Sequence, residues 1–414
     1  MNQLNSLLDQ IARRIPTPDD AYDRTIRRVG RRLLGRRLLA AAVAVAIAAV
    51  PVILLLRSGE GQRTAVSETP LDPWVGLDAG LQFIPAPPRV PAGAATVWTG
   101  TELIVWGGAG DKGSGVFADG FTYDPQASVW APLPDSPLSG RQLAGATWTG
   151  SEVLIWGGLD AELRPLNDGA AFNPSSNQWR TLPQAPITGR RPIATVWTGT
   201  EMVVWGSGSP HEAPDATGAA YNPVSDVWRL LPEAPISLSD GVAVWTGHEL
   251  IVMGPADRSA NTLPPSSAYF AQAIAYRSDM DTWRTLPSPE LTPWVALAWD
   301  GSRVLSVDYM GEASAFDPKT DEWAKVSRPP LDGGEFIPRL AYSSGDAVLV
   351  LYGGVAVFSG GAWRDLTDRV DVSSDSFSYS YTPVAAGRAV ILIPSDTSSS
   401  ATEVPVWVAD ADSE

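Results

Sequence analysis

A short motif close to Ala-x-Trp-Thr-Gly, kept in four copies and decayed in three later ones, recurs along this chain of 414 residues and limits its possible folds more than any other feature. Aligned on the glycine, seven copies follow one another at intervals of 42 to 54 residues. The anchoring glycines are Gly100, Gly150, Gly199, Gly247, Gly301, Gly345 and Gly387. Repeats of roughly 40–50 residues are typical of propellers and related arrays. The repeat therefore favours one large β architecture over the two or three domains that length alone would allow.

Each copy predicts a β-hairpin. Two apolar runs flank the glycine, as in ATVWTGTELIVWGG of the first copy, and both are continuous rather than alternating. A continuous apolar strand is covered on both faces, as the inner strands of a propeller blade are by the neighbouring blades. The glycine supplies the turn between the two strands.

A second signature predicts two further strands in each repeat. After each of the first six hairpins, an aromatic residue is followed by a tryptophan seven residues later, or five residues later in the sixth copy. The pairs are Tyr123/Trp130, Phe172/Trp179, Tyr221/Trp228, Tyr276/Trp283, Phe316/Trp323 and Phe358/Trp363. Asp-Pro or Asn-Pro after the aromatic, present in four copies, is turn chemistry that ends the third strand. We expect four strands in a blade, with the tryptophans packed between blades.

These repeats resemble the kelch family. A glycine pair ends the second strand at Gly107-Gly108, Gly157-Gly158 and Gly353-Gly354, and the spaced aromatic and tryptophan follow it. The third and fourth copies keep one glycine, whereas the fifth and seventh have Asp308 and Pro394 in its place. The resemblance covers roughly residues 72–410 and implies an all-β, kelch-like β-propeller.

The number of blades follows from how the ring closes. The seventh hairpin, Arg388–Pro394, has a plausible third strand at Thr402–Ala409, and then the chain nearly ends. Residues 72–84 can supply the missing fourth strand and so remove an exposed edge. We predict seven blades, with six as the alternative if the last copy is an irregular cap. Trp74 and Trp407 are expected where the ring closes.

The segment before the propeller predicts a membrane anchor. Residues 38–56 contain no charge and are long enough to cross a bilayer as a helix. Residues 1–37 carry nine Arg and four Asp, so this tail should stay cytoplasmic and the propeller, after a linker at 57–71, should be extracytoplasmic. The expected location is the cell membrane. The chain should cross it once, and residues 38–56 should contact membrane lipid. A cleavable signal peptide is the alternative. The tail has helical spacing, and 27 Arg against 3 Lys indicates a GC-rich bacterial genome.

Composition excludes several kinds of chemistry. The chain has no Cys and two His, so disulfides, Cys-ligated metals, thiol nucleophiles and three-His centres are excluded. No P-loop, GxSxG or HExxH motif is present. Residues 38–414 carry a net charge of −21, which repels nucleic acid. We therefore expect no metal, no cofactor and no nucleic-acid partner.

Candidate ligand residues lie in the segments that open on the mouth of a propeller, between strands two and three and between blades. The mouth candidates are Arg141, Arg190, Arg191, Asp240, Trp294, Glu335 and Arg339. Arg141 and Arg190 each stand nine residues before their anchoring glycine and are expected at equivalent places, where an Arg ring could hold a carboxylate or a sugar. The alternative is that these arginines make interblade salt bridges and hydrogen bonds.

Three functions remain open. The favoured one is a membrane-anchored binding module for an extracytoplasmic protein or glycan. A propeller enzyme acting on a sugar acid, of the epimerase kind, requires Glu335, Arg339, Arg141 and Arg190 to converge in the mouth. A transmembrane sensor would relay ligand binding to residues 1–37. Propellers host unrelated functions, so the fold alone does not choose among the three.

Overall fold

The computed structural model describes residues 73–74, 77–89, 91–110, 115–206, 216–255, 270–292, 294–331, 338–351, 354–370, 381–394 and 403–410. The chain divides into two units, Met1–Ser67 and Glu68–Glu414. The predicted tail, span and linker at 1–71 lie outside the described residues. In the described part, no helix has the length and apolar character needed to cross a membrane.

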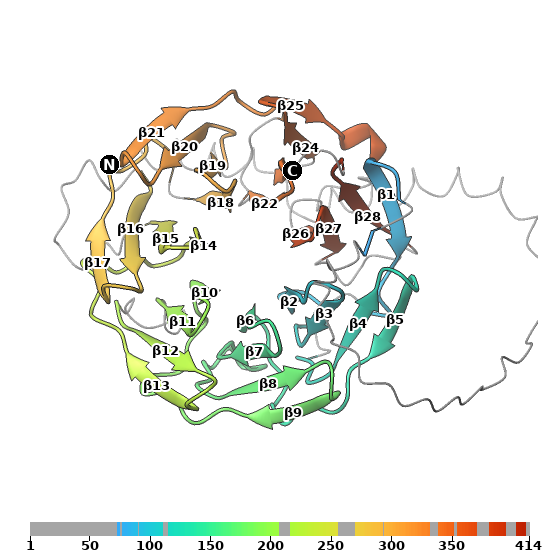
Figure 1. The fold of residues 1–414 in the computed structure, drawn as a ribbon, viewed down its shortest axis with the longest axis vertical. Helices are drawn as coiled ribbons and strands as arrows, with labels where there is room; N and C mark the ends of the chain where they lie inside the picture. Colours follow the sequence, from blue (N-terminus) through green and yellow to red (C-terminus); the bar gives the residue numbers. More distant parts are fainter. Residues whose placement is uncertain are drawn as a thin grey trace, which may run out of the picture. The chain divides into compact units, whose positions relative to one another are not determined.

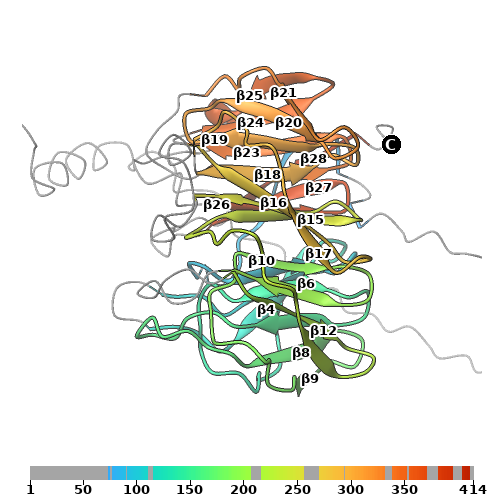
Figure 2. The same ribbon diagram turned by 90° about the vertical axis from the view of Figure 1, so that its left-hand side faces the viewer.

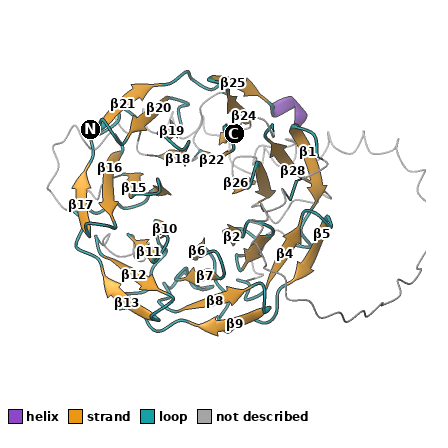
Figure 3. Ribbon diagram, in the orientation of Figure 1, coloured by secondary structure: helices purple, strands orange, loops and turns teal. Residues whose placement is uncertain are grey.

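The described strands form seven four-stranded antiparallel sheets arranged as blades around one axis (Figures 1 and 3). Blades 1 to 3 are β2 (Ala95–Trp98), β3 (Leu103–Trp106), β4 (Gly120–Asp124), β5 (Val129–Pro132); β6 (Gly145–Trp148), β7 (Val153–Trp156), β8 (Gly169–Asn173), β9 (Gln178–Thr181); and β10 (Ala194–Trp197), β11 (Met202–Trp205), β12 (Gly218–Asn222), β13 (Val227–Leu230). The prediction of four strands per blade is confirmed.

The remaining blades continue this order. Blades 4 to 6 are β14 (Val242–Trp245), β15 (Glu249–Gly254), β16 (Gln272–Arg277), β17 (Thr282–Thr285); β18 (Val295–Trp299), β19 (Val304–Asp308), β20 (Ala313–Asp317), β21 (Glu322–Lys325); and β22 (Arg339–Ser343), β23 (Asp346–Leu351), β24 (Gly354–Ser359), β25 (Ala362–Asp365). Blade 7 is β26 (Tyr381–Ala386), β27 (Ala389–Pro394), β28 (Glu403–Val408) and β1 (Gly80–Pro85), and a short 3-10 helix (Thr367–Arg369) follows β25.

Burial explains the continuous apolar runs. Every residue of the second strands β3, β7 and β11 is buried, because neighbouring blades cover both faces of each sheet. Trp106, Trp156 and Trp205 end these three strands and are at most 1 % exposed. Trp156 packs on Trp228 of the next blade, with ring centroids 5.8 Å apart. The strand-two tryptophans therefore belong to the core between blades, as predicted.

The outer tryptophans join each blade to the one before it. The indole Nε1 of Trp179 donates to the backbone oxygen of Pro134, 3.1 Å away, and Trp228 donates to Pro183 at 2.9 Å. Trp130, Trp283, Trp323 and Trp363 make the equivalent bond to the preceding blade. The repeat of about 48 residues thus carries one apolar contact and one directed hydrogen bond across each of these interfaces.

Charged side chains reinforce the interfaces of the middle blades. Arg229 of β13 binds Glu201 of its own blade at 2.8 Å and reaches Asp281 and the Tyr276 hydroxyl of the next blade. The Tyr276 hydroxyl donates to Asp281 over 2.6 Å. Burial, with this hydrogen bond, raises the pKa of Tyr276 to about 12. Arg180, Glu152, Tyr221 and Asp226 repeat the arrangement one blade earlier.

The ring closes between the two ends of the propeller, which confirms seven blades rather than six. β1 pairs with β28 from Gly80↔Val408 to Pro85↔Glu403 and forms the outer strand of blade 7. The predicted outer strand at 72–84 is therefore observed slightly later, and Trp74 lies before it. The Trp74 indole is 1 % exposed, donates to the Ala386 oxygen at 2.7 Å and stacks on Trp98.

The two faces of the ring differ. Short turns connecting strands one to two and three to four lie on one side, which we call the turn face. The longer two-to-three loops and the interblade segments lie on the other, which we call the mouth face (Figure 2). β1 runs from the turn face to the mouth face, since Gly80 pairs beside the last residue of β28. The chain therefore enters and leaves the propeller on the turn face.

Candidate functional site

The glycine pairs bring the mouth-face segments into close contact. Gly107 and Gly108 have φ angles of 72° and 89°, and a Cβ on Gly107 would lie 2.8 Å from the backbone oxygen of Arg141. Only glycine tolerates both the left-handed conformation and this approach. The Gly108 amide donates to the same Arg141 oxygen at 2.8 Å. The pair thus anchors the interblade segment that carries Arg141.

Arg141 makes contacts between two blades, which is the alternative expected for the mouth arginines. Its side chain is fully buried, and its guanidinium donates to the Gly157 oxygen and to both carboxylate oxygens of Asp168 in the next blade, at 2.8 and 3.0 Å. Burial alone would raise the pKa of Asp168. The hydrogen bonds and the charge of Arg141 outweigh burial, so the pKa of Asp168 lies below its usual value. Arg141 joins blades 1 and 2.

Arg190 repeats this arrangement one blade later. Its side chain is fully buried, and Nη1 donates to the backbone oxygen of Thr217 at 2.9 Å. The Gly158 amide donates to the Arg190 backbone oxygen at 2.9 Å, as Gly108 does to Arg141. The equivalence predicted from the spacing is confirmed, and both side chains contact the next blade.

The fifth copy achieves a similar contact without glycines. Asp308 is 1 % exposed, and its Oδ2 accepts hydrogen bonds from the amide and hydroxyl of Thr292 in the interblade segment, at 3.0 and 2.9 Å. Its Oδ1 accepts from the amides of Met310 and Glu312 in the two-to-three turn. The buried carboxylate therefore joins the two mouth-face segments that a glycine pair joins elsewhere.

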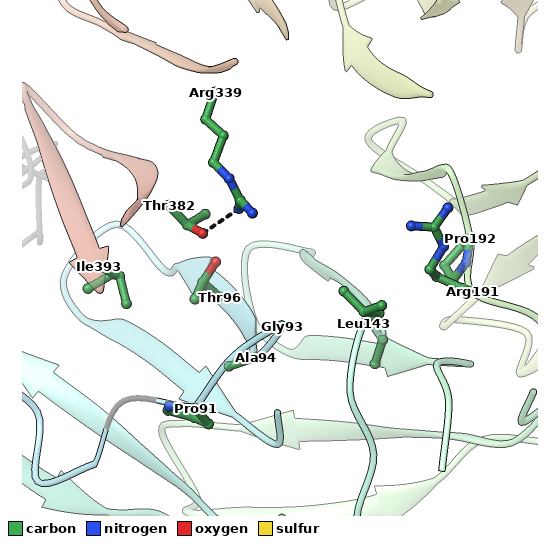
Figure 4. A pocket seen from close by; sticks show the side chains of 11 residues that line it. Pro91, Gly93, Ala94, Thr96, Leu143, Arg191, Pro192, Arg339, Thr382 and Ile393 are labelled. Atoms are coloured by element: carbon green, nitrogen blue, oxygen red, sulfur yellow. Dashed lines mark hydrogen bonds between the residues drawn. The ribbon is translucent and has the colours of Figure 1, made fainter. Parts of the chain in front are cut away.

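A cavity of about 240 Å³ opens at the mouth-face ends of the inner strands (Figure 4). Five blades contribute to it, and its lining consists of Pro91, Gly93, Ala94, Thr96, Leu143, Ala144, Arg191, Pro192, Arg339, Thr382 and Ile393. Arg191 and Arg339 stand on opposite sides of the opening (Figure 4). The described residues of the lining include two cations and no carboxylate.

Arg339 begins β22 and extends toward blade 7. Its Nη1 donates to the Thr382 hydroxyl at 2.6 Å, and it forms no ion pair with any described carboxylate. Burial lowers the pKa of Arg339, since removal from water disfavours the charged form. An arginine still remains protonated at neutral pH. The cavity therefore has a positive charge that the described side chains leave unbalanced.

Arg191 and Asp240 are brought together as an ion pair, 2.7 Å between Nη2 and Oδ1. Both side chains are about one third exposed and come from successive interblade segments. Asp240 also accepts the Gly241 amide at 2.8 Å. Asp240 therefore holds the Arg191 side chain at the cavity from the segment before blade 4 and balances its positive charge.

Apolar side chains are exposed on the same face. Trp294 is 46 % exposed and packs edge-on against Tyr309, with ring centroids 5.9 Å apart. Met310 in the adjoining turn is also 46 % exposed. Leu143, Leu163 and Phe270 are the other exposed large apolar residues in the described mouth-face loops. Trp294 precedes β18, whose neighbour β22 begins with Arg339, so both lie at the mouth-face ends of adjacent inner strands.

The four residues required for an enzyme do not converge in the described structure. Arg141 and Arg190 are buried between blades, and Glu335 lies outside the described residues. His211 and Glu212, a polar pair in the third two-to-three loop, also lie outside them. Among the residues that are described, no group of three His, Cys, Asp or Glu side chains is placed to hold a metal ion.

Thr96, Thr382 and Leu143 are cavity residues that the sequence reasoning missed. Thr96 lies inside the repeated motif of the first strand, and Thr382 lies in the most divergent copy, so neither stands out. Leu143 has a φ of 55°, which is uncommon for a residue with a Cβ, and it is 38 % exposed. A strained, exposed leucine cannot be recognised from the sequence.

Comparison with known proteins adds no family to this fold. No protein-family model matches the sequence, and no curated protein matches it. The chain is a seven-bladed β-propeller on its own geometry.

Proposed function

We propose that this chain is a membrane-anchored, kelch-type β-propeller whose mouth face binds an extracytoplasmic protein or glycan. The observation that carries the proposal is the exposure of Trp294 and Met310 on the same face as the cationic cavity, whose lining includes Leu143. Exposed apolar groups beside a concave polar site are typical of binding surfaces. The long loops that build this face are also the part of a propeller most free to vary.

The kelch assignment is supported by the glycine pairs. Gly107-Gly108 and Gly157-Gly158 both adopt left-handed conformations and anchor the following interblade segment through one amide each. The physical role of the motif is thus the same in two successive blades. Asp308 shows how a later copy keeps the connection after losing the motif.

The membrane anchor is supported by the charge-free stretch 38–56 and the arginines before it. Its amino end is cytoplasmic and its propeller extracytoplasmic. The chain joins the propeller on the turn face, next to Trp74.

Binding through the mouth face predicts a clear difference between two surface substitutions. The full chain is tested against an array of glycans and a set of extracytoplasmic proteins. Trp294→Ala should weaken the strongest interaction at least about tenfold, because exposed aromatic residues are frequent binding hot spots. Met280→Ala, which removes an apolar side chain 59 % exposed on the turn face, should leave it unchanged. Binding lost in Met280→Ala and kept in Trp294→Ala would contradict the proposal.

A further inference from the structure

The mouth-face cavity has the chemistry of a carboxylate site. We propose that Arg339 binds the carboxylate of a small polyhydroxylated acid, the class to which hexuronates belong, while Arg191 and the hydroxyls of Thr96 and Thr382 contact the hydroxyl groups of that acid. This inference rests on the proposed function, since it names the ligand chemistry of the same face. It is carried by the contacts and the size of the cavity.

The first argument is the unbalanced charge of Arg339. Its guanidinium has five N–H groups, and among the described residues it uses one hydrogen bond, to Thr382. A partly buried cation without a counter-ion is unfavourable, and a buried ion pair is stable only when the remaining N–H groups are also satisfied. A carboxylate supplies the counter-ion and also satisfies two N–H groups, because its two oxygens accept two parallel hydrogen bonds from one guanidinium. The described lining contains no carboxylate that already does this.

The second argument is that the site is preorganised. Thr382 fixes Arg339 from blade 7, and Asp240 fixes Arg191 from blade 4. The two guanidinium groups therefore stand on opposite sides of the opening before any ligand arrives (Figure 4). Groups held in advance lose less conformational entropy when they bind. Leu143, held at a φ of 55° on the wall, is a further local strain of the kind that collects at binding sites.

The third argument concerns size and polarity. A volume of about 240 Å³ is just below the range of about 300–1,000 Å³ that holds drug-sized ligands. It suits one sugar-sized acid better than a folded peptide segment. The hydroxyls of Thr96 and Thr382 can bond to ligand hydroxyls, and the Thr382 oxygen already accepts from Arg339, so its proton remains to donate. Acidic side chains of a protein partner carry the same carboxylate and are the competing source.

The test uses the full chain and calorimetric titration with D-glucuronate, D-glucose and a glutamate-rich peptide. We expect glucuronate to bind at least about tenfold more tightly than glucose, since charge-assisted hydrogen bonds are roughly twice as strong as neutral ones. Arg339→Gln should lower the affinity for glucuronate at least about tenfold. Arg328→Gln should not, because Arg328 is a half-exposed arginine that does not line the cavity.

A second variant guards against a folding defect. Arg339→Lys keeps the charge but loses the planar fork, so its affinity should lie between those of the wild type and Arg339→Gln. Equal binding of glucose and glucuronate, or unchanged affinity in both Arg339 variants, would overturn the inference. Binding of the peptide without glucuronate would also overturn it. The proposed function is tested separately and fails if Trp294→Ala captures the partner as well as the wild type does.

Discussion

Replacing Trp74 by alanine is expected to lower the free energy of unfolding by about 3–5 kcal/mol. The indole is buried where the two ends of the propeller meet, donates to the Ala386 oxygen and stacks on Trp98 at 5.8 Å. Arg388 also donates to the backbone oxygen of Trp74 at 2.9 Å, so the segment before β1 is joined to the first turn of blade 7. Loss of the indole leaves a cavity and removes the hydrogen bond to the Ala386 oxygen at the closure.

Chemical denaturation of the two chains measures this effect, and Trp294→Ala is the matched control. Trp294 is the same residue type, also off the repeated positions, but 46 % exposed. Its removal should change the unfolding free energy by no more than about 0.5–1 kcal/mol. Equal losses in the two variants would show that Trp74 does not contribute to closure of the ring.

Arg141→Ala is expected to destabilise the propeller by about 3 kcal/mol at neutral pH. The variant removes a fully buried guanidinium and leaves the Gly157 oxygen and the Asp168 carboxylate without their donor. Asp168 is 54 % exposed, so water recovers part of its loss and the effect falls at the lower end for a buried pair. Arg191→Ala breaks an ion pair between partly exposed groups and should lose about 1 kcal/mol or less.

The loss in Arg141→Ala should also depend on pH. Arg141 holds the pKa of Asp168 below its usual value in the folded state. The ionised carboxylate therefore contributes stability above the unfolded pKa of about 3.9, and this contribution disappears as the pH falls through the lower folded pKa. Unfolding free energies of wild type and variant should converge at acid pH. A difference that stays constant from pH 7 to pH 3 would exclude the Asp168 pair as its source.

The fold was predictable because the same local sequence pattern recurs from blade to blade. The turn glycine and the continuous apolar pair recur in seven copies and the spaced tryptophan in six, and each has one structural meaning. The outer strand of blade 7 was harder to place, since it has no copy of the tryptophan signature. Its observed start at Gly80 follows from pairing with β28, a contact between residues more than 300 positions apart that no local pattern records.

The candidate site was predictable only in part. Spacing placed Arg141 and Arg190 correctly in the interblade segments, but it says nothing about which way a side chain turns. The glycine pair draws the backbone so close that each arginine points into the next blade. Arg339 instead begins a strand at the mouth-face end and reaches the cavity. The hydroxyls of Thr96 and Thr382 line the same cavity because closure of the ring brings blades 1 and 7 together.

The absence of cysteine from the sequence allows the membrane topology to be measured directly. Single cysteines are introduced at Val224, which is 95 % exposed in a turn of the propeller, and at Ser6 in the basic tail. Spheroplasts of a bacterial host expressing the full chain are treated with a membrane-impermeant maleimide. We expect Val224→Cys to react in intact spheroplasts and Ser6→Cys to react only after lysis. Protection of Val224→Cys until lysis would contradict a membrane-anchored propeller presented outside the cell.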